Sequence, residues 1–193
     1  MIVGAFYIGG HYEVCGAKLK NDCEKHGYEY DIFQPDDLKE FCDKKMKGVT
    51  MRNWICRYKP QFIRDMLDKH KKPVLYLDVD CSIVKKIDTK VFKGKKIGIC
   101  HQDDNANKVI WDAMASCVYF YPCEEAYSFL NLWEYKCLHL HMDRADHYFL
   151  KTTLVDFQVF KEFGIGYLGK VFISKKKIND PYILYNARKY RRK

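Results

Sequence analysis

Two aspartates, Asp78 and Asp80, follow directly after a short, continuous apolar run at 74–77. Such a run predicts a central strand covered on both faces, and alternate side chains of a strand point to the same side, about 7 Å apart at their roots. Two carboxylates placed there repel each other unless a cation lies between them or one is protonated. A divalent ion with oxygen ligands, Mn²⁺ or Mg²⁺, removes that repulsion and completes its shell with substrate phosphates. The pair therefore predicts a metal and diphosphate site, with capping of the turn into Cys81 and Ser82 as the structural alternative.

The elements that position this pair alternate between strand and helix. Short apolar runs predict strands, and apolar residues at helical spacing predict helices. The predicted strands are 2–8, 28–33, 74–77, 97–101 and 117–121, and the predicted helices include one ending at Gly27, one opening at Lys59 and Pro60, and two at 124–138 and 144–155. This order predicts one α/β domain over residues 1–187, with a largely parallel sheet flanked by helices. Residues 188–193 are interpreted as a basic tail or as the start of a linker to further domains of a longer chain. Ligands of such sheets bind beyond the carboxyl ends of the strands, where the aspartates lie.

Length and composition describe an ordinary globular domain. The chain has 193 residues, of which 48% are hydrophobic and 16% aromatic, enough to fill a core. No apolar run approaches the roughly 18 residues that span a bilayer, and the N-terminal segment reads as a strand and not as a signal peptide. The nine cysteines include no CxxC pair and indicate buried free thiols in a reducing compartment, so we expect a cytoplasmic protein.

The segment Val74-Leu75-Tyr76-Leu77-Asp78-Val79-Asp80 resembles the YLDxD segment of GT-A-fold glycosyltransferases. The surrounding order is similar too: an N-terminal strand and glycine loop, a Lys-Pro helix before the DxD strand, a helix with Trp133, and an Asp-His-x-x-Leu segment at 146–150. The resemblance covers nearly the whole chain, whose compactness is similar to that of glycosyltransferase domains of large DNA viruses, chloroviruses in particular. It implies a GT-A-like fold and metal-dependent transfer of a glucose- or rhamnose-like hexose or deoxyhexose from a UDP-sugar to a glycan or viral glycoprotein acceptor.

The resemblance also implies which residues bind the donor. In the family, the first loop and the region before the DxD motif hold the nucleotide. By position these residues are Tyr7, Gly9, Gly10, Tyr12, Arg57 and Lys59, together with Asp78. A tyrosine can stack on a uracil ring, a glycine permits close backbone approach, and a cation pairs with a diphosphate. The structural alternatives are a core position for Tyr7 and a surface position for Lys59.

An inverting transfer needs a carboxylate that deprotonates the acceptor hydroxyl. Asp146 and Asp143 frame the start of a predicted helix, and the segment at 146–150 resembles a DQxxL-like segment of the family, so Asp146 is the first candidate and Asp143 the second. A helix N-cap is the alternative use of either residue. Asp103, Asp104 and Asp112 are further candidate bases, and His101 and His147 are candidate ligands, although structural roles explain both histidines as well. No histidine follows His147, so the third metal ligand of many retaining relatives is missing.

Two other function classes fit parts of the sequence. The segment Leu77 to Ile83 also resembles the DxDx(T/S) nucleophile segment of haloacid-dehalogenase-like phosphatases, with Asp78 as nucleophile. Against this, Cys81 takes the usual glycine position and the strand comes late in the chain. The net charge of +9 and the 15 tyrosines suggest a nucleic-acid-binding domain. Because the tyrosines are scattered and several lie in apolar runs, we expect them in the core and no nucleic-acid partner.

Overall fold

The computed structural model describes residues 1–101, 113–158, 165–168, 173–174 and 182–185. The candidate bases Asp103, Asp104 and Asp112, the side chain of His101 and the basic tail at 188–193 lie outside these residues. Among the helices described, none is both long and apolar enough to cross a membrane.

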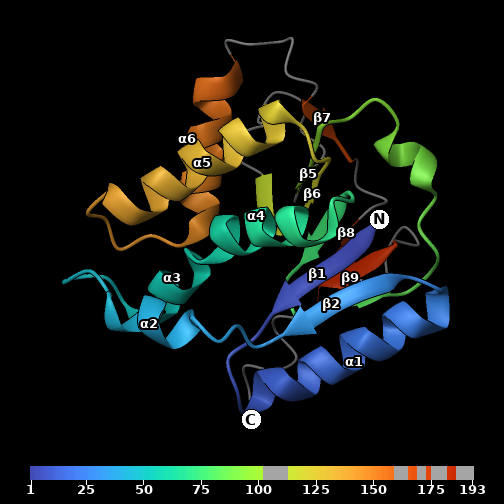
Figure 1. Ribbon diagram of the computed structural model, residues 1–193, viewed down its shortest axis with the longest axis horizontal. Helices are drawn as coiled ribbons and strands as arrows, with labels where there is room; N and C mark the ends of the chain where they lie inside the picture. The colour runs from blue at the N-terminus through green and yellow to red at the C-terminus, as the bar shows by residue number, and fades with distance from the viewer. Residues whose placement is uncertain (102–112, 159–164, 169–172, 175–181, 186–193) are drawn as a thin grey trace.

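A six-stranded mixed sheet forms the centre of the molecule (Figure 1). Its strands, in spatial order, are β2 (Glu29–Phe33), β1 (Ile2–Phe6), β3 (Val74–Leu77), β6 (Ala113–Phe120), β5 (Ile97–His101) and β7 (Ile165–Tyr167). The pairs β1–β2, β1–β3 and β5–β7 are parallel, whereas β6 runs antiparallel to both of its neighbours. The α/β class is therefore confirmed, but the sheet is mixed and not simply parallel. Only residues 102–112 separate β5 from β6, which is too short an interval for the helical crossover that a parallel pair needs.

Helices cover both faces of this sheet (Figure 1). On one face, α4 (Lys59–His70), α5 (Glu124–His139) and α6 (Asp146–Gln158) pack against alternate strand residues, including Phe6, Tyr76 and Phe120. On the other face, α1 (His11–His26) packs through Leu19 and Cys23 against the intervening strand residues. The alternation follows from the two-residue period of a strand. It explains why β1 and β3 are buried along their whole length.

Two short helices, α2 (Leu38–Asp43) and α3 (Met51–Cys56), lie between β2 and α4, and a 3₁₀ helix, η1 (Thr89–Phe92), precedes β5. Helix α3 was not predicted from the sequence. Thr50 caps α3 by accepting a hydrogen bond from the backbone N–H of Asn53 at 3.4 Å, which is the usual role of threonine before a first helical turn. Gly27 ends α1 with φ 71°, a left-handed conformation that glycine adopts without strain.

A second, three-stranded sheet returns the end of the chain to the segment after Asp80. It consists of β4 (Cys81–Ile83), β9 (Ile183–Tyr185) and β8 (Ile173–Ser174). Strand β4 pairs antiparallel with β9. Residues that follow the two aspartates are therefore held by a strand from about a hundred positions later in the chain.

Candidate active site

A pocket of about 450 Å³ opens beyond the carboxyl ends of β1 and β3. Five predicted site residues line it: Tyr7, Tyr12, Lys59, Asp78 and Asp80. Its other lining residues come from the ends of β1 and β3 and from α3. The fold thus gathers residues from three separate stretches of the sequence, 6–12, 51–59 and 76–80, at the edge where an open α/β sheet binds ligands.

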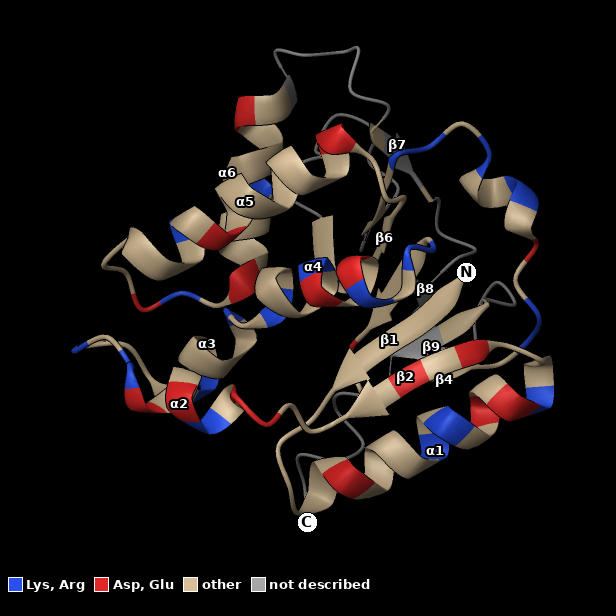
Figure 2. Ribbon diagram, in the orientation of Figure 1, with Lys and Arg blue, Asp and Glu red and all other residues tan. Residues whose placement is uncertain are grey.

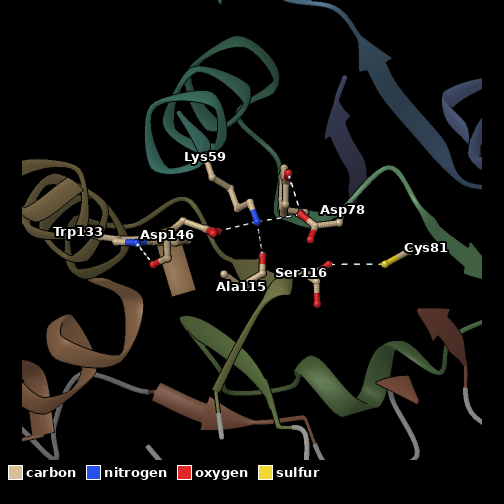
Figure 3. A network of polar contacts seen from close by, with 8 residues as sticks. Lys59, Asp78, Cys81, Ala115, Ser116, Trp133 and Asp146 are labelled. Carbon is tan, nitrogen blue, oxygen red and sulfur yellow. Dashed lines mark hydrogen bonds and ion pairs between the residues drawn. The ribbon is translucent and has the colours of Figure 1, made fainter. Parts of the chain in front are cut away.

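Asp78 has a defined orientation at the floor of this pocket. Its Oδ1 lies 2.8 Å from the Nζ of Lys59 and accepts a hydrogen bond from the hydroxyl of Tyr76 at 3.2 Å (Figure 3). The side chain keeps 28% of its surface exposed. Burial raises the pKa of Asp78, and the charge of Lys59 opposes that rise. The turn into β4 is closed by the backbone, from the N–H of Cys81 to the carbonyl of Asp78 at 2.8 Å, so the carboxylate of Asp78 is not its cap.

Lys59 is the buried centre of the polar network (Figure 3). Besides Asp78, its Nζ contacts Oδ2 of Asp146 at 2.6 Å, donates to the carbonyl of Ala115 at 3.0 Å and lies 5.1 Å from the centre of the Tyr76 ring. Burial alone would lower the pKa of Lys59, but the carboxylates of Asp146 and Asp78 outweigh it and hold the pKa well above its usual range. The ammonium group is therefore charged and committed to contacts within the protein.

Asp80, two residues after Asp78 in the sequence, lines the same pocket and is partly exposed. Its charge acts on two neighbouring thiols. Burial is the main cause of the raised pKa values of Cys15 and Cys81, and the carboxylate of Asp80 adds to both. Asp80 is therefore close to Cys15 of α1 and to Cys81 of β4, and it contributes negative charge to the pocket.

The two aspartates fit a hard divalent cation. Both side-chain contacts that the structure gives Asp78 fall on Oδ1, which leaves Oδ2 for a cation, and Asp80 lines the same pocket. Within the described part of the chain, no cluster of three or more His, Cys, Asp or Glu residues is assembled for a metal. The site thus suits Mg²⁺ or Mn²⁺, which commonly take one or two carboxylates and complete the shell with water and substrate phosphates, better than a zinc ion with a full set of protein ligands.

The first loop shapes the pocket wall through its two tyrosines. Tyr7 packs on Gly16 of α1, where an added Cβ would come within 2.9 Å of the ring, so a glycine is required for this approach. Tyr12 is 46% exposed and lines the pocket as well. Gly10 has φ 61° at the start of α1, and Gly9 donates its N–H to Oε1 of Gln34 at 2.8 Å. The glycines form the turn that carries the tyrosines, and neither is among the lining residues.

Arg57 lies away from the pocket, which differs from the prediction that it faces a nucleotide. It is fully buried, and its guanidinium group donates to four backbone carbonyl groups. The acceptors are Cys137 at 2.7 Å, Leu140 at 3.4 Å, Arg144 at 3.2 Å and Met142. Its plane also lies over the Phe149 ring, 4.6 Å from the centroid. Arg57 therefore fixes the connection between α5 and α6.

Both candidate bases are also engaged by other residues of the protein, Asp146 in the interior and Asp143 at the surface. Asp146 is 4% exposed and begins α6, with its carboxylate held against Lys59. That 2.6 Å contact is an ion pair without hydrogen-bond geometry. Asp143 accepts three hydrogen bonds on Oδ1, from the N–H of Thr50 at 2.9 Å, the hydroxyl of Thr50 at 3.1 Å and the side chain of Asn53 at 2.8 Å. Neither aspartate lines the pocket, and this geometry does not support a base role for them. His147, next to Asp146, has its pKa lowered by burial.

Helix α3 supplies the wall that the sequence reasoning missed. Met51, Arg52, Ile55 and Cys56 all line the pocket. Burial raises the pKa of Cys56 to about 12, so this thiol is protonated at neutral pH. The available signal was Thr50, an N-cap type of residue before a short run that contains four apolar positions.

Among solved structures, the chain is similar to the crystal structure of a glycosyltransferase involved in the glycosylation of the major capsid of PBCV-1. The two share 10% sequence identity and superpose with a TM-score of 0.64, over 96% of this chain and 93% of that chain. No protein-family model matches the sequence, and no curated protein matches it. At this level of identity the likeness establishes the fold. The predicted glycosyltransferase-like α/β fold is confirmed.

Proposed function

We propose that the protein is a metal-dependent glycosyltransferase of the GT-A type, which uses a UDP-sugar as donor. The observation that carries this proposal is the pocket beyond β1 and β3, where Asp78 and Asp80 face the same space as Tyr7 and Tyr12. The glycosyltransferase-like fold supports it. Acidic residues suit the metal that accompanies a diphosphate, and the tyrosines suit the uracil ring.

In this proposal the chain's own residues bind and orient the donor. Asp80 and the free oxygen of Asp78 hold Mn²⁺ or Mg²⁺, which when bound neutralises the negative charge of the departing diphosphate. Lys59 does not bind the donor phosphates; it fixes the rotamer of Asp78 and balances two buried carboxylates. Tyr76 supports the same orientation from β3.

The substrate part of the proposal follows the resemblance in the sequence. The transferred group is a hexose or deoxyhexose, glucose- or rhamnose-like, and the acceptor is a glycan, in the setting of viral glycoprotein synthesis. The structurally similar glycosyltransferase is involved in the glycosylation of a major capsid, which agrees with such an acceptor. All nine cysteines are free thiols, which agrees with synthesis in the reducing cytoplasm.

The proposal is tested by binding and turnover in parallel. UDP with Mn²⁺ is expected to raise the melting temperature of the wild-type protein more than UDP or Mn²⁺ alone, because ligands that bind the native state stabilise it. Asp80→Asn should abolish that extra shift and lower Mn²⁺-dependent hydrolysis of UDP-glucose or UDP-rhamnose by about 100-fold or more. Asp43→Asn is the matched control, because Asp43 is an exposed aspartate at the end of α2 and should change neither.

The same purified protein also distinguishes the proposed glycosyltransferase from the two alternative functions, a phosphatase and a nucleic-acid-binding domain. Turnover of p-nitrophenyl phosphate that depends on Asp78, without any response to UDP, would replace the proposal by the phosphatase. Salt-dependent binding to DNA without nucleotide affinity would replace it by the nucleic-acid binder. The distribution of charge argues against the second outcome, because Figure 2 shows acidic residues interspersed with the basic ones along α1 and α4.

A further inference from the structure

The connection between α5 and α6 is tied to the start of α3 by one side chain. Asp143 lies in this connection, and the oxygen that it presents accepts from both the N–H and the hydroxyl of Thr50 and from the side chain of Asn53. These are the N-cap and third residues of α3. The backbone bond from Thr50 is the main reason why the pKa of Asp143 lies below its usual range. The carboxylate is therefore charged at neutral pH, and its hydrogen bonds are of the stronger, charge-assisted kind.

A second tie runs in the opposite direction, one residue beyond the end of α3. Arg57, the C-cap residue of α3, donates to carbonyl groups on both sides of Asp143, those of Met142 and Arg144. It also donates to Cys137 and Leu140 at the end of α5. The connection thus holds α3 at its beginning through Asp143 and at its end through Arg57. We call this pair of ties the α3 clamp.

Four residues between the two ties line the pocket, namely Met51, Arg52, Ile55 and Cys56. Arg52 is exposed and lines the pocket, and its charge acts on the thiol of Cys56, one turn further along α3. Among the residues that the structure describes, Lys59 is the other cation of the pocket lining, and two carboxylates already neutralise it. No ion pair within the described residues engages Arg52. It is therefore the side chain whose positive charge is available to an anionic ligand.

We propose that Arg52 contacts the diphosphate of the donor and that Asp143 is a positioning residue, which fixes Arg52 at the pocket by holding α3. This inference rests on the proposed function and deepens it, because it assigns the phosphate contact to a helix that the sequence reasoning did not predict. It also gives Asp143 a role that requires no contact with substrate. A six-residue helix is too short to be stable alone, so its orientation depends on such ties.

The first test is a double-mutant cycle on the affinity for UDP at saturating Mn²⁺, measured by isothermal titration calorimetry. Arg52→Met and Asp143→Ala should each raise the dissociation constant about tenfold. Asp143→Ala should add little in the Arg52→Met background, because the positioned charge is already gone. Asp143→Asn keeps a carbonyl oxygen for Thr50 and should restore most of the affinity. Effects that multiply fully in the double variant would overturn the positioning role.

The second test measures how firmly the α3 clamp holds α3 in the absence of any ligand. Hydrogen exchange of the α3 amides should accelerate at least tenfold in Asp143→Ala and return towards the wild-type rate in Asp143→Asn. Asp88→Ala is the matched control: Asp88 caps η1 through the N–H of Lys90 at 3.0 Å, and its loss should leave α3 and UDP affinity unchanged. Unchanged α3 exchange in Asp143→Ala would overturn the clamp itself. If the wild type binds no UDP while α3 exchange responds as expected, the proposed function and the Arg52 contact fail and the clamp stands.

Discussion

Two pairs of aspartates, each only two or three positions apart in the sequence, have different surroundings in this molecule. Asp78 and Asp80, at the end of β3, reach a pocket. Asp143 and Asp146, at the start of α6, turn towards the protein, where Thr50 and Lys59 engage them. In the sequence both pairs are candidates for a functional role, but in the structure only the first pair lines the pocket.

The difference lies in where each carboxylate is placed relative to the pocket. A charged group in a protein is tolerated when neighbours pair with it, and a buried group without such partners is costly. Asp146 is buried against a lysine, and Asp143 has three donors on one oxygen. Asp78 likewise has both of its side-chain contacts on Oδ1 and is 28% exposed, but it differs from Asp143 and Asp146 because it lines the pocket. Placement at the pocket, more than residue type, distinguishes the candidate ligand site.

The largest expected effect comes from removing the cation that joins the two pairs. Lys59→Met leaves the carboxylates of Asp78 and Asp146 facing each other without compensation, and breaking such a buried ion pair typically costs about 3 kcal/mol or more in the free energy of unfolding. Urea denaturation at pH 7 measures this loss. The control is Lys44→Met, which breaks the exposed pair with Glu40 and should leave the free energy of unfolding nearly unchanged, because water screens exposed ion pairs. Equal losses in the two variants would show that the buried network is not a stabilising centre.

A smaller effect on the free energy of unfolding is expected from replacing either of the two aspartates that pair with Lys59, and it should differ between them. Asp146→Asn should lower the free energy of unfolding by about 2 kcal/mol, because Asp146 is buried and its ion pair is lost. Asp78→Asn should cost about 1 kcal/mol, because its side chain is partly exposed, yet it should weaken binding of UDP with Mn²⁺ more than Asp146→Asn does. Denaturation and calorimetry on the same two proteins check this reversal of order. Identical rankings in both measurements would mean that the comparison between the pairs is wrong.

The smallest expected effect is a difference in titration between the two pairs. The pKa of Asp143 lies below its usual range because of its bond from Thr50, whereas burial raises the pKa of Asp78. A carboxyl group with a lowered folded pKa contributes stability above its unfolded pKa of about 3.9 and loses it as the pH falls through the folded value. Carbon-detected NMR titration of the metal-free protein should place the midpoint of Asp143 below that of Asp78. Asp143→Asn and Asp78→Asn assign the signals, and the reverse order would contradict the structure.

Local patterns predicted most of the elements that carry the site. The apolar runs at 2–8 and 74–77 identified the central strands, because a strand buried on both faces needs apolar residues at every position. Gly27 and Pro60 marked the end of one helix and the start of another, because each residue has a backbone preference that acts locally. The direction of β6 was not predictable in this way, because the pattern of a strand is the same whichever way its neighbour runs.

The sequence by itself determined that two acids follow a buried strand, that tyrosines and glycines follow the first strand, and that the chain can fill an α/β core. It did so because strand period, helix period and turn residues are local properties. Only the tertiary structure decided which charges meet: Lys59 with Asp146, Asp143 with Thr50, and Arg57 with the carbonyl groups of a distant connection. Such pairings join residues about ninety positions apart. They depend on the orientation of whole helices, which no single stretch of the sequence specifies.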